Sequence, residues 1–120
     1  MPTLSHACVR VLDLARSVAF YRETLGLTPP AGADHGGPGL APGLPGRRRH
    51  PFQLELCREL QRTEPYRLGM TPPMWPLVSQ DFQGLKAKHQ AMGLIFDELA
   101  NGIYFIQDPD ATSWRFFPPD

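Results

Sequence analysis

The chain has 120 residues, of which 42% are hydrophobic and 20% charged, and its 12 basic and 12 acidic side chains cancel. This composition predicts one globular domain with a hydrophobic core and argues against a nucleic-acid partner. No apolar run reaches the ~20 residues that span a bilayer, so we expect no membrane partner. The first residues lack the pattern of a secretion signal, and the protein is expected to be cytoplasmic, with Cys8 and Cys57 as reduced thiols too far apart for a disulfide scaffold.

The first predicted elements are a strand over residues 6–12 and a helix that begins after Asp13. The Asp13 carboxylate is a good N-cap because it can accept from the free N–H groups of the first turn. Gly26 supplies the left-handed residue that ends the helix. The apolar side chains that recur between them at helical spacing are Leu14, Val18, Tyr21 and Leu25.

Glycine and proline make up half of residues 29–51. Proline cannot donate to a ladder of strand hydrogen bonds and glycine weakens a strand interior. We therefore predict a long irregular loop with at most one short strand, and residues 31–49 as the most mobile part of the domain. His35 and His50 lie in this segment, and the basic run at residues 47–49 is interpreted as a solvated loop.

The next predicted strand covers residues 52–57, where apolar and polar side chains alternate. The second half then repeats the order of the first: an apolar run at 75–78, a helix capped by Asp81 and ended by Gly93, and three strands at 94–99, 101–108 and 112–117. Asn101-Gly102 is a strong hairpin signal between two of these strands. Recurrence of strand, Asp cap, helix and Gly-Leu stop favours a duplicated β-α-β-β-β unit.

Strand alternation predicts which side chains share a face. On the first strand His6, Cys8 and Arg10 lie opposite the apolar side chains. On the strand at 52–57, Glu55 lies with Gln53 and Cys57, and on the last strand Arg115 lies with Ser113 and Phe117. We therefore expect His6, Glu55 and Arg115 on the polar faces of their strands, whereas His89 lies on or beside the apolar stripe of the second helix and is expected to be structural.

Several motifs resemble those of the vicinal oxygen chelate superfamily, and within it glyoxalase I (lactoylglutathione lyase). They are His6, "VLDL" from Val11, Ser17, Phe20-Tyr21, Leu25-Gly26, "LEL" from Leu54, "YRLG" from Tyr66 and "FIQDPDA" from Phe105. The resemblance implies an α+β fold of two βαβββ modules whose curled mixed sheet surrounds a cleft. It implies one domain over residues 1–120, with module 1 at about 3–60, a linker at about 61–72 and module 2 at about 73–120.

The resemblance also implies a metal site. The lyase holds nickel or zinc through His, Glu, His and Glu on four strands, and His6 and Glu55 match the first two ligands. The third ligand belongs where Met74 and Trp75 stand, and Arg115 takes the place of the fourth. Two ligands make a weak site, and a guanidinium opposes a dication by roughly a few kcal/mol. We therefore expect no cofactor, with nickel or zinc at His6 and Glu55 as the alternative.

Two classes of function remain open. The superfamily that the chain resembles includes antibiotic-binding proteins, and the loss of half the metal ligands favours a degenerate glyoxalase-like protein that binds a small molecule in its cleft, with His6, Trp75 and Arg115 as ligand-binding residues. The alternative is a lyase or isomerase of the lactoylglutathione lyase type that abstracts a proton next to a carbonyl. Glu55 or His6 would then be the base and Arg115 would stabilise the oxyanion. The resemblance further implies a homodimer.

Overall fold

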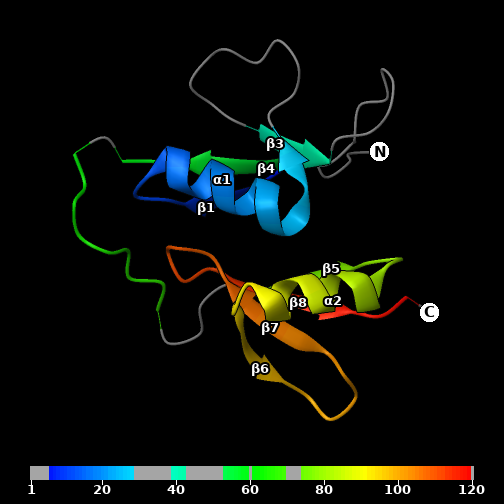
Figure 1. Cartoon of the computed structure of the whole chain (residues 1–120). Coiled ribbons are helices and arrows are strands. Elements are labelled where there is room, and N and C mark those ends of the chain that lie inside the picture. Colours follow the sequence, from blue (N-terminus) through cyan, green and yellow to red (C-terminus); the bar gives the residue numbers. More distant parts are fainter. Residues whose placement is uncertain (1–5, 29–38, 43–52, 60, 70–73, 120) are drawn as a thin grey trace, which may run out of the picture. The chain divides into compact units, whose positions relative to one another are not determined.

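The computed structural model describes residues 6–28, 39–42, 53–59, 61–69 and 74–119 (Figure 1). The chain divides into two compact units, Met1–Tyr66 and Arg67–Asp120. No helix in the described ranges is long and apolar enough to cross a membrane. His35, residues 47–49 and His50 lie outside these ranges, as does most of the segment expected to be mobile.

Unit 1 is a four-stranded mixed sheet with one helix. Its elements are β1 (His6–Arg10), α1 (Leu14–Leu25), β2 (Leu27–Thr28), β3 (Gly39–Pro42) and β4 (Gln53–Cys57). The strand order is β1-β4-β3-β2, in which β1 runs parallel to β4 and the other pairs are antiparallel. Strand β3 lies within the Gly/Pro-rich segment, most of which lies outside the described residues.

Unit 2 repeats this topology. Its elements are β5 (Met74–Val78), α2 (Phe82–Ala91), β6 (Ile95–Glu98), β7 (Tyr104–Gln107) and β8 (Ser113–Phe117). The order is β5-β8-β7-β6, and again the first strand runs parallel to the last while the other pairs are antiparallel. The α+β fold class and the duplicated β-α-β-β-β unit are confirmed.

Both helices begin at the predicted residues, and α1 ends at Gly26 as predicted, whereas α2 ends at Ala91 with Met92 as its C-cap before Gly93. Asp13 Oδ1 accepts from the backbone N–H of Arg16 at 3.0 Å, and Asp81 Oδ1 accepts from that of Gly84 at 3.1 Å. Each carboxylate thereby satisfies an N–H that has no partner inside its helix. Gly26 and Gly93 follow the helices with φ of 67° and 70°, the left-handed conformation that glycine adopts without a Cβ clash.

The buried face of α1 differs from the predicted apolar stripe. Its fully buried side chains are Ser17, Tyr21 and Thr24, whereas Leu14, Val18 and Leu25 are only half-buried. Thr24 can be buried because its hydroxyl donates to the backbone carbonyl of Phe20 at 2.7 Å. Two small polar side chains and one tyrosine therefore make up the buried face of α1. The sheet side of this core consists of Val9, Val11, Leu54 and Leu56.

The core of unit 2 is built around His89 of α2, which is fully buried. Its Nδ1 lies 2.9 Å from the hydroxyl oxygen of Tyr104 on β7. The ring of Tyr104 stacks on Phe116 of β8 with centroids 4.7 Å apart, and His89 meets Phe116 edge-on at 5.1 Å. Burial raises the pKa of the Tyr104 hydroxyl well above its usual range. His89 is therefore a structural residue, as the sequence predicts.

Candidate functional site

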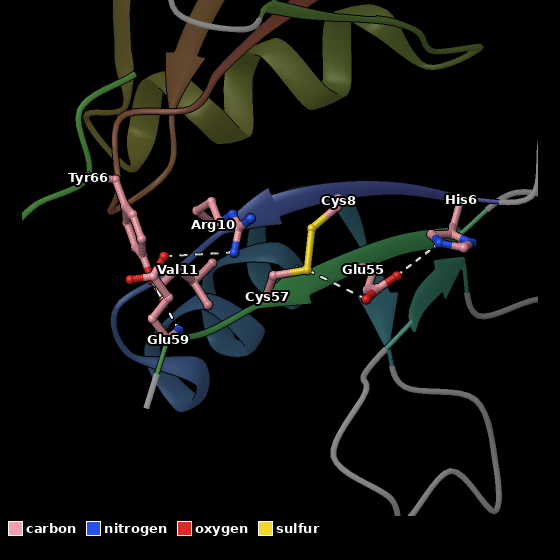
Figure 2. The surroundings of a disulfide bond; sticks show 8 residues. All are labelled: His6, Cys8, Arg10, Val11, Glu55, Cys57, Glu59 and Tyr66. Carbon is pink, nitrogen blue, oxygen red and sulfur yellow. Dashed lines mark hydrogen bonds and ion pairs between the residues drawn. A yellow bond between two sulfur atoms is a disulfide. The ribbon is translucent and has the colours of Figure 1, made fainter. Parts of the chain in front are cut away.

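Four chemically reactive side chains lie on one face of the β1–β4 pair in unit 1. Strand alternation places His6 and Cys8 on the same face of β1, and Glu55 and Cys57 on the same face of β4. The parallel register pairs Cys8 with Glu55. Figure 2 shows all four side chains on this face of the two strands. His6 and Cys8 are exposed, while Glu55 and Cys57 are half-buried, so the group can be reached from solvent.

The structure brings together the two residues that match the superfamily's first two metal ligands. His6 Nε2 lies 2.9 Å from Glu55 Oε2, with the side chains 51% and 39% exposed. A partly exposed pair of this kind contributes little to stability because water and salt screen it. Its position on an open sheet face leaves both groups available to a ligand.

The two cysteines form a disulfide, so the expectation of reduced thiols is wrong. Cys8 and Cys57 are bonded through their sulfurs, with Cα atoms 6.4 Å apart (Figure 2). They are 49 residues apart in sequence, but the parallel pairing of β1 with β4 makes them neighbours across two strands. Because the expected cytoplasmic location rested partly on reduced thiols, it stays a prediction.

Glu55 lies between the histidine and the disulfide. One carboxylate oxygen contacts His6, and the other, Oε1, lies 3.5 Å from Cys57 Sγ. The sulfurs of both cysteines and a carboxylate oxygen of Glu55 all lie within 4.8 Å of one another. The sequence signal for this cluster was strand alternation, which put each cysteine on the same face as His6 or Glu55. Because the two cysteines are far apart along the chain, the sequence alone did not predict that they meet.

Arg115 lies on the face of β8 opposite to that of Phe116, whose ring meets His89 of α2. Its guanidinium lies over the ring of Phe117, with 4.8 Å between Cζ and the ring centroid. Its Nε is buried and has no hydrogen-bond partner among the described residues. Phe105 of β7 is its register neighbour and is 8% exposed. The result is a cation with an unused donor beside two aromatic rings.

Trp75 does not share the face of Arg115. Trp75 pairs in register with Trp114, and their ring centroids are 6.4 Å apart. Arg115 instead pairs with Pro76, so its side chain points to the opposite face from Trp75. The aromatic partner of Arg115 is therefore Phe117. On β5 both neighbours of Trp75, Met74 and Pro76, share the face of Arg115.

The side chains present do not fit the superfamily's four-ligand metal site. His6 and Glu55 supply the first imidazole and carboxylate, but Met74 and Arg115 occupy the faces where the second pair belongs. A thioether is a soft, weak donor, and a guanidinium has no lone pair to offer a metal. Within the described residues, the group of three or more possible ligands is instead Cys8, Glu55 and Cys57.

A surface hollow of about 710 Å³ lies elsewhere in unit 1, beside α1. None of the predicted site residues lines it. Its lining residues are Leu12, Asp13, Leu14, Ala15, Val18, Ala19, Arg22 and Arg58.

Comparisons with solved structures show which proteins share this fold. The trypanothione-dependent glyoxalase I of Leishmania major is 24% identical over 98% of this chain and 87% of that chain, with a TM-score of 0.78. TnmS3, an antibiotic-binding protein from Streptomyces sp. CB03234, is 18% identical over 100% of this chain and 98% of that chain, with a TM-score of 0.70. A glyoxalase I variant from Zea mays is 23% identical over 94% of this chain and 43% of that chain, with a TM-score of 0.72.

Identities this low show the fold alone. Among proteins of curated function, none matches the sequence. A family model does match, over residues 3–116, which is nearly the whole chain. The chain therefore belongs to the Glyoxalase/Bleomycin resistance protein/Dioxygenase superfamily.

Proposed function

We propose that the chain binds a small molecule that carries a carboxylate or another electron-rich oxygen, and that Arg115 contacts this oxygen. The observation that carries the proposal is the buried Nε of Arg115, which has no hydrogen-bond partner in the described part of the chain. A buried donor without a partner costs about 1–3 kcal/mol, and a bound acceptor oxygen would recover this cost once the guanidinium turns Nε toward it. Membership of a superfamily with a solved antibiotic-binding protein supports the proposal.

The surroundings of Arg115 favour a flat ligand. The guanidinium lies over the ring of Phe117, and Phe105 is its neighbour across the strand pair. A planar cation next to aromatic rings suits an aromatic acid, because the acid can stack and accept two hydrogen bonds together. Trp75, on the other face of the sheet, has no part in this contact.

We propose that His6 and Glu55 form a separate small-molecule contact within unit 1. Both are polar and accessible. The imidazole of His6 can donate or accept a hydrogen bond with a ligand, and the carboxylate of Glu55 can accept one. Their contribution is to be measured separately from that of Arg115, through His6→Gln and Glu55→Gln.

The test is a thermal-shift and calorimetric titration of the whole chain with 2-naphthoate and with the uncharged 2-naphthamide. Naphthoate should raise the Tm more than naphthamide. Arg115→Met keeps the length and bulk of the side chain but removes the donors, and it should weaken naphthoate binding by about tenfold or more. Arg67→Met, at an exposed arginine of the same unit, is the control and should bind like the unaltered chain. Equal binding by Arg115→Met would refute the proposal.

Lyase activity is a second candidate, and the contact between Glu55 and His6 favours it. A carboxylate held at 2.9 Å by an imidazole is oriented in the manner of a general base. The substrate to supply is the hemithioacetal of glutathione and methylglyoxal, with thioester formation followed by absorbance. If the chain is a lyase, Glu55→Gln should abolish turnover while leaving naphthoate binding at Arg115 intact. Absence of turnover in the unaltered chain would exclude the lyase for this substrate and leave the binding proposal standing.

We also propose that the chain acts as a homodimer, as its superfamily resemblance implies. Sedimentation velocity at micromolar concentration should report twice the chain mass of 13.4 kDa. A species of 13.4 kDa alone would contradict this.

A further inference from the structure

The Cys8–Cys57 disulfide adjoins a carboxylate that is itself positioned by a histidine. Glu55 contacts His6 through one oxygen, and its other oxygen lies 3.5 Å from Cys57 Sγ. Figure 2 shows His6, Glu55 and the disulfide side by side along the β1–β4 pair. Two sulfurs, a carboxylate and an imidazole are the donor types that zinc takes in proteins.

We propose that reduction of this disulfide creates a binding site for a divalent zinc ion. The ligands are Cys8 Sγ, Cys57 Sγ and Glu55 Oε1, and the fourth coordination position is open to water or a small ligand. His6 is a positioning residue that holds Glu55 Oε2. This donor set differs from the four-strand ligand set of the superfamily, since it lies entirely on β1 and β4. It is also independent of the ligand proposed for Arg115.

The observed separations suit such an ion. With Zn–S near 2.3 Å and Zn–O near 2.0 Å, tetrahedral coordination puts sulfur and oxygen ligands about 3.5 Å apart. Cys57 Sγ and Glu55 Oε1 are 3.5 Å apart already. All three ligand atoms lie within 4.8 Å of one another, so small side-chain rotations bring them to one centre once the S–S bond is broken.

The surroundings of the cluster support a bound cation. The imidazole of His6 fixes the outer oxygen of Glu55, as outer partners commonly do for ligating carboxylates. The guanidinium of Arg10, also on β1, lies 4.0 Å from the carboxylate of Glu59, which offsets its positive charge. Cys8 is exposed and Cys57 half-buried, so a reductant and an ion can both reach the sulfurs.

The oxidised and metal-bound forms exclude each other. A dithiol or phosphine reductant supplies two electrons and, with two protons, converts the disulfide to two thiols, while the reductant is oxidised. Binding of Zn²⁺ then displaces both thiol protons, since only thiolates ligate the metal. A small-molecule disulfide oxidant, such as oxidised glutathione, takes up the two electrons of the thiolates and is reduced to two thiols, which restores the S–S bond and releases the ion. The redox state of the two cysteines therefore decides whether unit 1 holds a metal.

The test uses the whole chain and cobalt(II) chloride as a spectroscopic probe for zinc. After anaerobic reduction with a phosphine, the chain should bind one Co²⁺ and show an intense ultraviolet thiolate-to-cobalt absorption. Zinc chloride should abolish this absorption by displacing the cobalt. The oxidised chain should show neither the absorption nor stoichiometric binding.

Variants separate the proposed roles. In the reduced state, Cys57→Ser should lose about half of the absorption because one of the two thiolates is gone. Glu55→Gln should keep the absorption, since both thiolates remain, but bind Co²⁺ more weakly. His6→Gln should keep the absorption with about tenfold weaker binding, the usual effect of losing an outer partner. Glu23→Gln, an exposed glutamate on α1, is the matched control and should behave like the unaltered chain.

Three results would overturn the proposal. The first is Co²⁺ binding by the reduced chain without thiolate absorption. The second is an unchanged spectrum in Cys57→Ser. The third is a reduced chain that is unfolded by circular dichroism and does not refold with zinc, because the site requires the β1–β4 pair.

Discussion

The carboxylate of Glu55 lies 2.9 Å from the imidazole of His6, across the parallel pair formed by β1 and β4. The second oxygen of the same carboxylate lies 3.5 Å from the disulfide sulfur of Cys57. Any change in the oxidation state of that sulfur therefore acts directly on the carboxylate that His6 holds. The histidine–glutamate pair and the cysteine pair are one connected group of side chains.

Replacing His6 by glutamine should change function more than stability. The pair it forms with Glu55 is 51% and 39% exposed, and solvent-screened pairs of this kind contribute at most about 1 kcal/mol. The free energy of unfolding, from urea titration, should therefore fall by less than about 1 kcal/mol. A larger loss would show that His6 supports the sheet itself.

Tyr104→Phe should destabilise the chain by about 1–3 kcal/mol, because it removes the buried hydroxyl that pairs with Nδ1 of His89. Urea unfolding of the variant measures this loss. Tyr66→Phe is the comparison: the Tyr66 hydroxyl donates to Val11 O at 3.1 Å and accepts from Glu59 N–H at 3.3 Å, but Tyr66 is only half-buried. Water can replace the lost hydroxyl at a half-buried site, so the loss should be smaller, and equal losses in the two variants would contradict the role given to burial.

Stability should decline at alkaline pH partly through Tyr104. Burial raises the pKa of its hydroxyl in the folded state, so the folded chain keeps this proton when the unfolded chain releases it near pH 10. The contribution of this hydroxyl to the free energy of unfolding is fully present below about pH 10. Above that pH it is lost at about 1.4 kcal/mol per pH unit. Urea unfolding from pH 9 to 11 should show a shallower decline for Tyr104→Phe. Parallel declines would contradict the assignment to this residue.

Ala111→Gly should stabilise the turn between β7 and β8. Ala111 has φ of 70°, and the turn is held by Asp108 Oδ1, which accepts from the N–H groups of Asp110 and Thr112 at 2.9 Å. Glycine removes the strain of the left-handed conformation, and this gain exceeds the cost of the extra conformational entropy that glycine gives the unfolded chain. The free energy of unfolding should therefore rise by about 0.5–1 kcal/mol. Ala87→Gly on α2 is the opposite case and should cost about 1 kcal/mol in thermal unfolding. Destabilisation by Ala111→Gly would show that the Ala111 side chain stabilises the fold by more than its left-handed backbone conformation costs.

Local chemistry explains what could be predicted from the sequence. Asp13, Gly26 and their counterparts Asp81 and Gly93 act on backbone groups within a few residues, so the helix limits depend on neighbours along the chain. The repeat revealed the fold because both units use these same signals in the same order. Strand alternation likewise assigned His6, Glu55 and Arg115 to the faces on which they lie, since its period of two residues is a property of the strand alone.

Register and pairing were decided only by the tertiary structure. Cys8 and Cys57 meet because β1 runs parallel to β4, and no local signal states which two strands pair or at what offset. The same is true of Trp75 and its neighbour Pro76. The residue of β8 with which each of them pairs is set by the offset between β5 and β8, and this pairing decides the side chains that Trp75 meets. A shift of one residue moves every side chain of a strand to the other face. The faces and helix limits were therefore fixed by local chemistry, whereas the contacts among His6, Glu55 and the two cysteines arose from long-range strand pairing.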